Sequence, residues 1–301
     1  MSKRTITRVV VFGGTGFLGR VIVGCLVADG YRVRAVARRP LPEWAASPTA
    51  AIEFFQADVR VEDEVAAALT DMDAAVNAVS LYVEQHGASF EAIHVEAAAR
   101  IARLAHAQGL GHLVHLSGIG VDASSRSAYV RARAKGEDAV RAAFPCAAIL
   151  RPSLLVSTEG GMLETLEGVA HLPVVPLFGN GSVHLQPVDV ADAARAVREV
   201  IGRSVEGIIE LGGADVIRYR ELLEAIQAAS GRRRPMLPLP MPIWHTLAGV
   251  LSLLPSPPLT RDQLVLMSED NVVASGARGF EALGLFPRGV REVLHERAWH
   301  G

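Results

Sequence analysis

The glycine-rich stretch VFGGTGFLGR, residues 11–20, constrains the fold of this 301-residue chain more than any other feature. It follows the β-branched run RVVV and opens an apolar helical pattern that ends at Gly30. Glycines at this spacing permit a tight turn, and the N–H groups at the start of the helix can then bind a pyrophosphate. A glycine-rich turn that binds nothing is the alternative. We expect a dinucleotide site whose loop contacts come from Gly13, Thr15, Gly16, Phe17, Leu18 and Gly19.

Short β-branched runs alternate with Ala-rich helical patterns through the first half of the chain. We expect strands within residues 8–14, 31–38, 52–59, 74–81, 112–120 and 147–155, and helices within 17–30, 90–109 and 128–144. This alternation predicts an α/β fold, a doubly wound parallel Rossmann sheet with helices on both faces.

Past about residue 156 the rhythm changes, because glycine and proline punctuate short segments. We therefore expect a Rossmann domain from residues 1–156 plus about 186–203. A smaller α/β domain from 157–185 and 204–301 should cover the carboxyl edge of the sheet, where such sheets bind ligands. Asp189 or Asp192 is the expected N-cap of a helix within 186–200.

The second expected strand ends in the cations Arg38 and Arg39, where NAD enzymes usually carry an acid for the ribose 2′-hydroxyl. Two guanidinium groups suit a 2′-phosphate, so NADP(H) is the preferred cofactor and NAD(H) the alternative. Two exposed loop arginines without a ligand are the simpler interpretation. Further contacts are expected at the ends of the third and fourth strands, from Asp58, Val59, Ala78, Val79 and Ser80; Asp58 could also cap a helix that begins near Val61.

Composition excludes several classes of function. The net charge of −2 gives no basic face for nucleic acid, and no segment has the apolar length of a transmembrane helix. Two isolated cysteines indicate a reducing cytoplasm. His112 and His115 point to opposite faces of one strand, so we expect no metal site.

The chain resembles the extended and atypical short-chain dehydrogenase/reductases, and within them the NAD(P)-binding accessory subunit of respiratory complex I and its bacterial relatives. The segments that carry the resemblance are VFGGTGFLGR, QADVRVEDEVAAAL, FEAIHVEAAARIARLA, HLVHLSGIG, AYVRARAKGEDAVRAAFP, ILRPS, QPVDVADAARAV and PPLTRDQLVLMSEDNVV. The last of these, residues 257–273, is the most specific, because it lies outside the nucleotide fold.

The resemblance implies that Ser117, Tyr129 and Arg133 surround the nicotinamide and its ribose, with Pro152 and Ser153 on the nicotinamide side. Arg133 stands where the family places a lysine, and LLVSTEGGMLETL replaces a segment similar to FGPEDRFLN. Four residues turn a helix by about 400°, so Arg133 shares a face with Tyr129, whereas Lys135 does not. Arg133 can clamp the ribose and lower the pKa of the tyrosine, but a guanidinium relays protons poorly.

The resemblance implies an NADP(H)-binding structural or assembly protein of a quinone-linked respiratory complex, peripheral on the inner face of the membrane. The alternative is an NADPH-dependent oxidoreductase acting on a quinone-like or carbonyl compound, as in ubiquinone biosynthesis, and a sugar-nucleotide epimerase or dehydratase comes third. Residues 241–259, MPIWHTLAGVLSLLPSPPL, carry an apolar stripe at helical spacing. That stripe is expected to be core, with a docking helix for a membrane or partner as the other interpretation.

Overall fold

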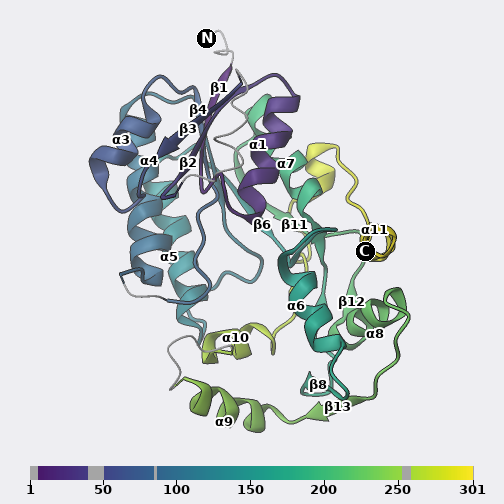
Figure 1. The fold of residues 1–301 in the computed structure, drawn as a ribbon. Coiled ribbons are helices and arrows are strands. Elements are labelled where there is room, and N and C mark those ends of the chain that lie inside the picture. Colours follow the sequence, from purple (N-terminus) through teal and green to yellow (C-terminus); the bar gives the residue numbers. More distant parts are fainter. Residues whose placement is uncertain (1–5, 40–50, 85–86, 253–258, 301) are drawn as a thin grey trace.

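The computed structural model describes residues 6–39, 51–84, 87–252 and 259–300. Its main sheet has seven parallel strands (Figure 1). In spatial order they are β11 (Gly207–Leu211), β6 (Ala148–Pro152), β5 (His112–Leu116), β4 (Ala74–Asn77), β1 (Arg8–Phe12), β2 (Arg32–Ala37) and β3 (Ile52–Gln56). The chain reverses its direction of travel across the sheet between β1 and β4, and ligands bind parallel sheets at such a point.

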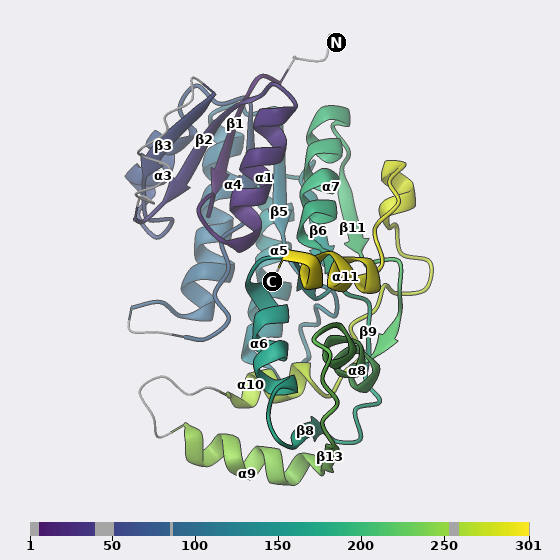
Figure 2. The same cartoon turned by 45° about the vertical axis from the view of Figure 1, so that its right-hand side comes forward.

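Helices cover both faces of this sheet (Figures 1 and 2). The helices α1 (Phe17–Ala28) and α7 (Val190–Arg203) pack on one face, where Ile22, Leu26 and Val197 are fully buried. The other face carries α3 (Glu62–Leu69), α4 (Ala98–Ala107) with the π-helical turn η1 (Glu91–Ala97) before it, and α5 (Ala128–Ala143). Burial of each large aliphatic side chain contributes about 1.5–3 kcal/mol. The predicted doubly wound α/β fold is confirmed.

A smaller part lies below the carboxyl ends of the strands (Figure 2). It has three short strand pairs, β7 (Leu155–Val156) with β10 (Val188–Asp189), β8 (Val175–Phe178) with β13 (Met236–Leu239), and β9 (His184–Leu185) with β12 (Ile217–Arg218). Its helices are α6 (Gly161–Ala170), α8 (Tyr219–Ala229), α9 (Met241–Leu251), α10 (Arg261–Leu266) and α11 (Val290–His300), and the 3₁₀ turn η2 (Phe280–Leu283) packs back on the main sheet.

The strand β11 lies beyond residue 203, where we expected the first domain to end. It pairs in parallel with β6 and so belongs to the main sheet. Its residues Ile209 and Leu211 are fully buried in the core beneath α1 and α7, which gives this segment a physical reason to join the first part. We keep the division into two parts as a proposal, with 207–211 moved to the first.

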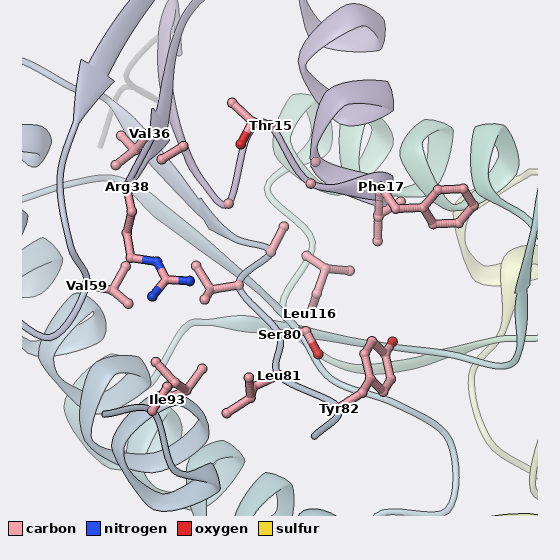
Figure 3. Close-up of a pocket in the computed structure, with 18 of the residues that line it drawn as sticks. Thr15, Phe17, Val36, Arg38, Val59, Ser80, Leu81, Tyr82, Ile93 and Leu116 are labelled. Carbon is pink, nitrogen blue, oxygen red and sulfur yellow. The ribbon is translucent and has the colours of Figure 1, made fainter. Parts of the chain in front are cut away.

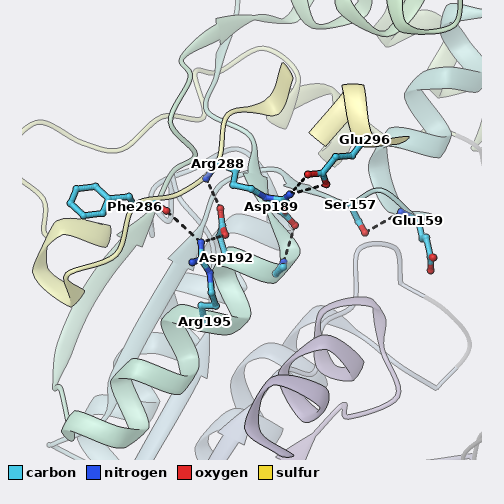
Figure 4. Close-up of polar contacts among 9 residues, drawn as sticks. Ser157, Glu159, Asp189, Asp192, Arg195, Phe286, Arg288 and Glu296 are labelled. Carbon is cyan, nitrogen blue, oxygen red and sulfur yellow. Dashed lines mark hydrogen bonds and ion pairs between the residues drawn. The ribbon is translucent and has the colours of Figure 1, made fainter. Parts of the chain in front are cut away.

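Polar contacts join α7 to the segment that leads into α11 (Figure 4). Asp189 is the N-cap of α7 and accepts a hydrogen bond from the backbone N–H of Ala191 at 2.9 Å. The same carboxylate pairs with Arg288, whose backbone N–H donates to Asp192 at 2.6 Å. Arg288 also pairs with Glu296 on α11 at 2.8 Å. Of the two expected caps, Asp189 therefore caps the helix, and Asp192 anchors the C-terminal segment.

The helix α5 approaches η1 more closely than a side chain would allow. A Cβ atom added at Gly136 would overlap the backbone carbonyl of His94. This contact brings the His94 ring edge-on to Tyr129, with ring centroids 5.4 Å apart. The absence of a side chain at one position of α5 thus fixes how the aromatic groups around Tyr129 pack.

We predict that Gly136→Ala destabilises the protein by about 1–3 kcal/mol, because the added methyl group forces α5 away from η1. Gly24→Ala is the matched control: Gly24 lies on α1 with no atom near its missing Cβ, and this change should stabilise by up to about 1 kcal/mol. Urea unfolding of both variants measures the difference. Equal behaviour of the two would show that the close contact carries no energetic weight.

Candidate functional site

A cavity of about 340 Å³ opens at the carboxyl ends of β1, β4, β5 and β6 (Figure 3). Most of the residues predicted for the cofactor line it: Gly13, Thr15, Gly16, Phe17, Leu18, Gly19, Arg38, Asp58, Val59, Ala78, Val79, Ser80, Ser117, Arg133 and Pro152. Arg39, Tyr129 and Ser153 were also predicted but do not belong to the lining. Tyr82, Leu81, Ile93, Leu116 and Leu155 line it without having been predicted.

The glycines of residues 13–19 leave a backbone cradle at one end of the cavity. Gly13 has a φ of +77°, and an added Cβ would lie 2.9 Å from the carbonyl oxygen of Ala78. A Cβ at Gly19 would overlap the carbonyl of Gly13, so the first turn of α1 closes tightly onto the loop. Gly16, the N-cap of α1, lies beside this cradle. The geometry fits a pyrophosphate held by backbone N–H groups.

The side chains of Arg38 and Arg39 lie in different places relative to the cavity. The Arg38 side chain extends toward Val59 at the cavity (Figure 3), whereas Arg39 is exposed and lies outside the lining. Successive residues at a strand end point in opposite directions, which explains the difference. A 2′-phosphate in this cavity would meet Arg38.

Asp58 keeps its negative charge at the same end of the cavity. Its carboxylate accepts hydrogen bonds from the side-chain Nε and the backbone N–H of Arg60, both at 2.9 Å. These contacts, the side-chain bond above all, lower the pKa of Asp58. The helix α3 has Val61 as its N-cap and receives no side-chain cap, so the interpretation of Asp58 as a helix cap is wrong. Asp58 is therefore an ionised hydrogen-bond acceptor on the cavity wall.

Among the described residues that line the cavity, the cation Arg133 is buried, whereas Arg38 is exposed. Its Nε donates to the Tyr129 hydroxyl at 2.7 Å, and one terminal nitrogen donates to the Ser80 hydroxyl at 2.8 Å. The other terminal nitrogen donates to the carbonyl of Leu116 at 3.3 Å. These three partners are neutral oxygens, so hydrogen bonds hold the guanidinium in place.

Tyr129 lies behind this guanidinium rather than at the cavity surface. It is 8% exposed and stacks on Tyr82, with ring centroids 5.5 Å apart, and Phe90 packs edge-on against it at 5.6 Å. Burial raises the pKa of Tyr129 above its usual value, and this outweighs the opposing effect of Arg133. The expected effect of Arg133 is present, because its charge and its hydrogen bond both lower the pKa of Tyr129, but desolvation by burial is the larger cause and the net shift is upward.

Two histidines beside this group are buried. His94 shares a 2.9 Å hydrogen bond with the carbonyl of Leu81, and His115 one of 3.1 Å with the Asn77 amide. Burial lowers the pKa of each to about 3, and the positive charge of Arg133 acts in the same direction. Both imidazoles are consequently neutral at pH 7 and carry no proton that they could readily transfer.

The Ser117 hydroxyl is buried on the cavity wall and has no hydrogen-bond partner among the described residues. A buried polar atom without a partner is costly unless a ligand or water satisfies it. Ser153, in contrast, turns away from the cavity: its hydroxyl donates to the Asn271 side chain at 2.6 Å. Ser117 is thus free to meet a ligand, and Ser153 serves to hold the chain.

Residues 259–273, the part of the family-specific segment that the structure describes, hold the two parts together at the site. Asp262 on α10 accepts hydrogen bonds from the Ser127 hydroxyl at 2.7 Å and the Ala128 N–H at 2.6 Å, at the start of α5. Asn271 also accepts from the N–H of Leu154 at 3.1 Å. Sequence reasoning missed both residues, although the motif that contains them was singled out. Their positions show that this motif fixes α5 and the end of β6 around the cavity.

A membrane-spanning helix and a metal-binding cluster are both absent from the part of the chain that the structure describes. No helix there is long and apolar enough to cross a membrane. No group of three or more histidine, cysteine, aspartate or glutamate side chains there could hold a metal ion.

Comparison with known proteins agrees with this geometry. The profile of a family described as NAD(P)H-binding matches residues 13–199. The chain is 30% identical to NADH dehydrogenase [ubiquinone] 1 alpha subcomplex subunit 9 of Arabidopsis thaliana, over 92% of this chain and 73% of that protein. It is 29% identical to a ceramide reductase of Caulobacter vibrioides, over 78% of this chain and 74% of that protein.

The fold is also similar to that of a UDP-glucose 4-epimerase from Thermus thermophilus solved with NAD. The TM-score is 0.72 at 19% identity, and 98% of each chain is covered. At this identity the likeness concerns the fold alone. The profile match and the relatives along most of the chain settle the family: the protein belongs to the NAD(P)H-binding atypical short-chain dehydrogenase/reductases and is related to the accessory subunit of respiratory complex I.

Proposed function

We propose that this protein holds NADP(H) as a lasting component and acts as an accessory or assembly protein of a quinone-linked respiratory complex, with little reductase turnover. The observation that carries the proposal is the Arg133–Tyr129 pair, in which a guanidinium occupies the position of the lysine and binds the tyrosine hydroxyl. The similarity to complex I subunits supports the cellular role.

The binding half of the proposal rests on the cavity. The glycine cradle suits the pyrophosphate, and Arg38 offers a cation to a 2′-phosphate. Ser117 and Arg133 lie at the opposite end of the lining, where the first offers a free hydroxyl and the second offers N–H groups to the nicotinamide ribose and amide. A ligand that reached all of these groups would satisfy the Ser117 hydroxyl that is otherwise buried alone.

The second part of the proposal, low turnover, rests on how poorly the site could supply a proton to a substrate. A reduced nicotinamide held in this cavity would supply hydride, and a carbonyl oxygen would then need a proton from a side chain of the site. Tyr82 stacks on the Tyr129 ring, and Arg133 binds the Tyr129 hydroxyl. The pKa of Tyr129 is raised, and the neighbouring His94 is neutral. Arg133 stays protonated and cannot return a proton to the tyrosine. The site can therefore bind a nicotinamide while it protonates a substrate poorly.

A second candidate, an NADPH-dependent reductase of a carbonyl compound, has one observation in its favour, the similarity to a ceramide reductase. It requires Tyr82 to move so that the Tyr129 hydroxyl reaches the cavity. The exposed position of Tyr82 permits such a movement.

The first prediction separates the two arginines. Arg38→Ala should weaken NADPH binding by about 1.5–3 kcal/mol for each charged hydrogen bond lost, and it should leave NADH binding nearly unchanged. Arg39→Ala is the matched control and should alter neither, because that side chain lies outside the cavity lining. Isothermal titration of both nucleotides measures the effect. Equal weakening of NADPH and NADH by Arg38→Ala would remove the argument for the phosphorylated cofactor.

The second prediction tests proton supply directly. Arg133→Lys should keep NADPH affinity within a few-fold and raise the rate of NADPH oxidation by short-chain quinones or small aldehydes, because an ammonium group can exchange its proton. Adding Tyr129→Phe to Arg133→Lys should abolish the gain. Efficient turnover by the wild-type protein that Tyr129→Phe alone abolishes would contradict the proposal and favour the reductase.

A further inference from the structure

The helix α9 has one buried and one exposed apolar face. Trp244 and Ala248 are buried, and the indole N–H of Trp244 donates to the carbonyl of Leu177 at 3.0 Å. Ile243, Leu247 and Val250, spaced four and three residues apart, remain 51%, 42% and 61% exposed. Within residues 241–252 the predicted stripe therefore divides: one side is core, and the other is apolar and exposed, with no covering element among the described residues. Residues 253–258 of the predicted stripe lie outside the described residues.

The helix α9 lies at the edge of the molecule farthest from the amino ends of the main strands (Figures 1 and 2). The strand β13 leads directly into α9, and its Leu237 is 49% exposed as well. We call the three residues Ile243, Leu247 and Val250 the α9 ridge. Exposed apolar side chains gathered on one surface helix are typical of an interaction surface.

A cluster of arginines lies next to the ridge along the chain. Arg220, Arg232, Arg233 and Arg234 line a second cavity of about 460 Å³ between α8 and β13, with Glu224 as the one acid in its lining. Gln227, which is buried, holds this turn in place: its side-chain oxygen accepts a hydrogen bond from the N–H of Arg234 at 3.0 Å. Arg232, Arg233 and Arg234 thus lie on a turn that hydrogen bonds to Gln227 hold at both ends, and Arg220 lies on α8.

Every charged residue between Glu224 and Asp262 is an arginine. Residues 225–261 contain Arg232, Arg233, Arg234 and Arg261 but no aspartate or glutamate. A second copy of this chain would bring the same positive charges to the contact, which disfavours self-association through this edge. An anionic bilayer suits both features. It has an apolar layer for the ridge and, a few ångströms above that layer, a layer of phosphates for the arginines.

We propose that the α9 ridge and the arginine cluster together bind the surface of an anionic phospholipid membrane. The ridge enters the boundary between headgroups and acyl chains, and the arginines bind lipid phosphates. This inference is independent of the proposed nucleotide function, because none of these residues lines the nucleotide cavity.

Co-sedimentation of the full chain with vesicles tests the proposal. We expect binding to vesicles of equal parts phosphatidylcholine and phosphatidylglycerol, little binding to phosphatidylcholine alone, and weakening by salt. Arg232→Gln with Arg233→Gln should reduce the partition coefficient roughly 25-fold, at about fivefold per arginine. Leu247→Ser with Val250→Ser should reduce it by at least about tenfold.

Matched controls change the same residue types elsewhere. Arg8→Gln with Arg32→Gln removes two exposed arginines at the opposite end of the sheet, and Val216→Ser with Phe286→Ser removes two exposed apolar side chains away from α9. Both should bind vesicles like the wild type. All variants should keep the wild-type Tm and NADPH affinity, which separates a failure of membrane binding from a failure of folding or of the nucleotide site.

Three outcomes would overturn the proposal. The first is the absence of wild-type binding to the anionic vesicles. The second is equal loss in the control variants. The third is a dimer in light scattering that Leu247→Ser with Val250→Ser dissociates, since the ridge would then be a contact between copies of the chain.

Discussion

The buried guanidinium of Arg133 must satisfy its N–H groups inside the protein, and the carboxyl edge of the sheet is arranged around that requirement. Leu116 at the end of β5 offers its carbonyl, Ser80 after β4 offers its hydroxyl, and Tyr129 one turn earlier on α5 offers its phenol oxygen. A buried cation that lost these partners would cost several kcal/mol. The position of Tyr129 behind the cavity surface follows from this network.

The C-terminal segment keeps that network in register. Asp262 accepts hydrogen bonds at the start of α5, and Asn271 fixes Ser153 and Leu154 after β6. Both come from the motif that lies outside the nucleotide fold. The smaller part of the molecule thus does more than cover the cavity, because its side chains set the orientation of the helix that carries Tyr129 and Arg133.

Features that follow from backbone chemistry could be predicted from the sequence. The glycine loop, the parallel strands and most of the cavity lining depend on spacing and on strand order, which local patterns encode.

Features that depend on which way a side chain turns could not be predicted from the sequence. Arg38 and Arg39 are equivalent in sequence, yet one faces the cavity. Ser153 was expected beside the nicotinamide, but Asn271, 118 residues later, binds its hydroxyl. Tyr82 has no motif of its own, and only the folded chain brings it over Tyr129. The net rise in the pKa of Tyr129 could not be predicted for the same reason, since burial depends on these distant neighbours.

The nucleotide content of the purified wild-type protein tests the central claim most directly. The protein is freed of unbound nucleotide and denatured, and the released material is separated by chromatography and identified by nicotinamide fluorescence. The account predicts close to one nucleotide per chain, phosphorylated and reduced, because the site binds it firmly and has no efficient route to oxidise it. Protein that is empty and also fails to bind added NADPH would contradict the account.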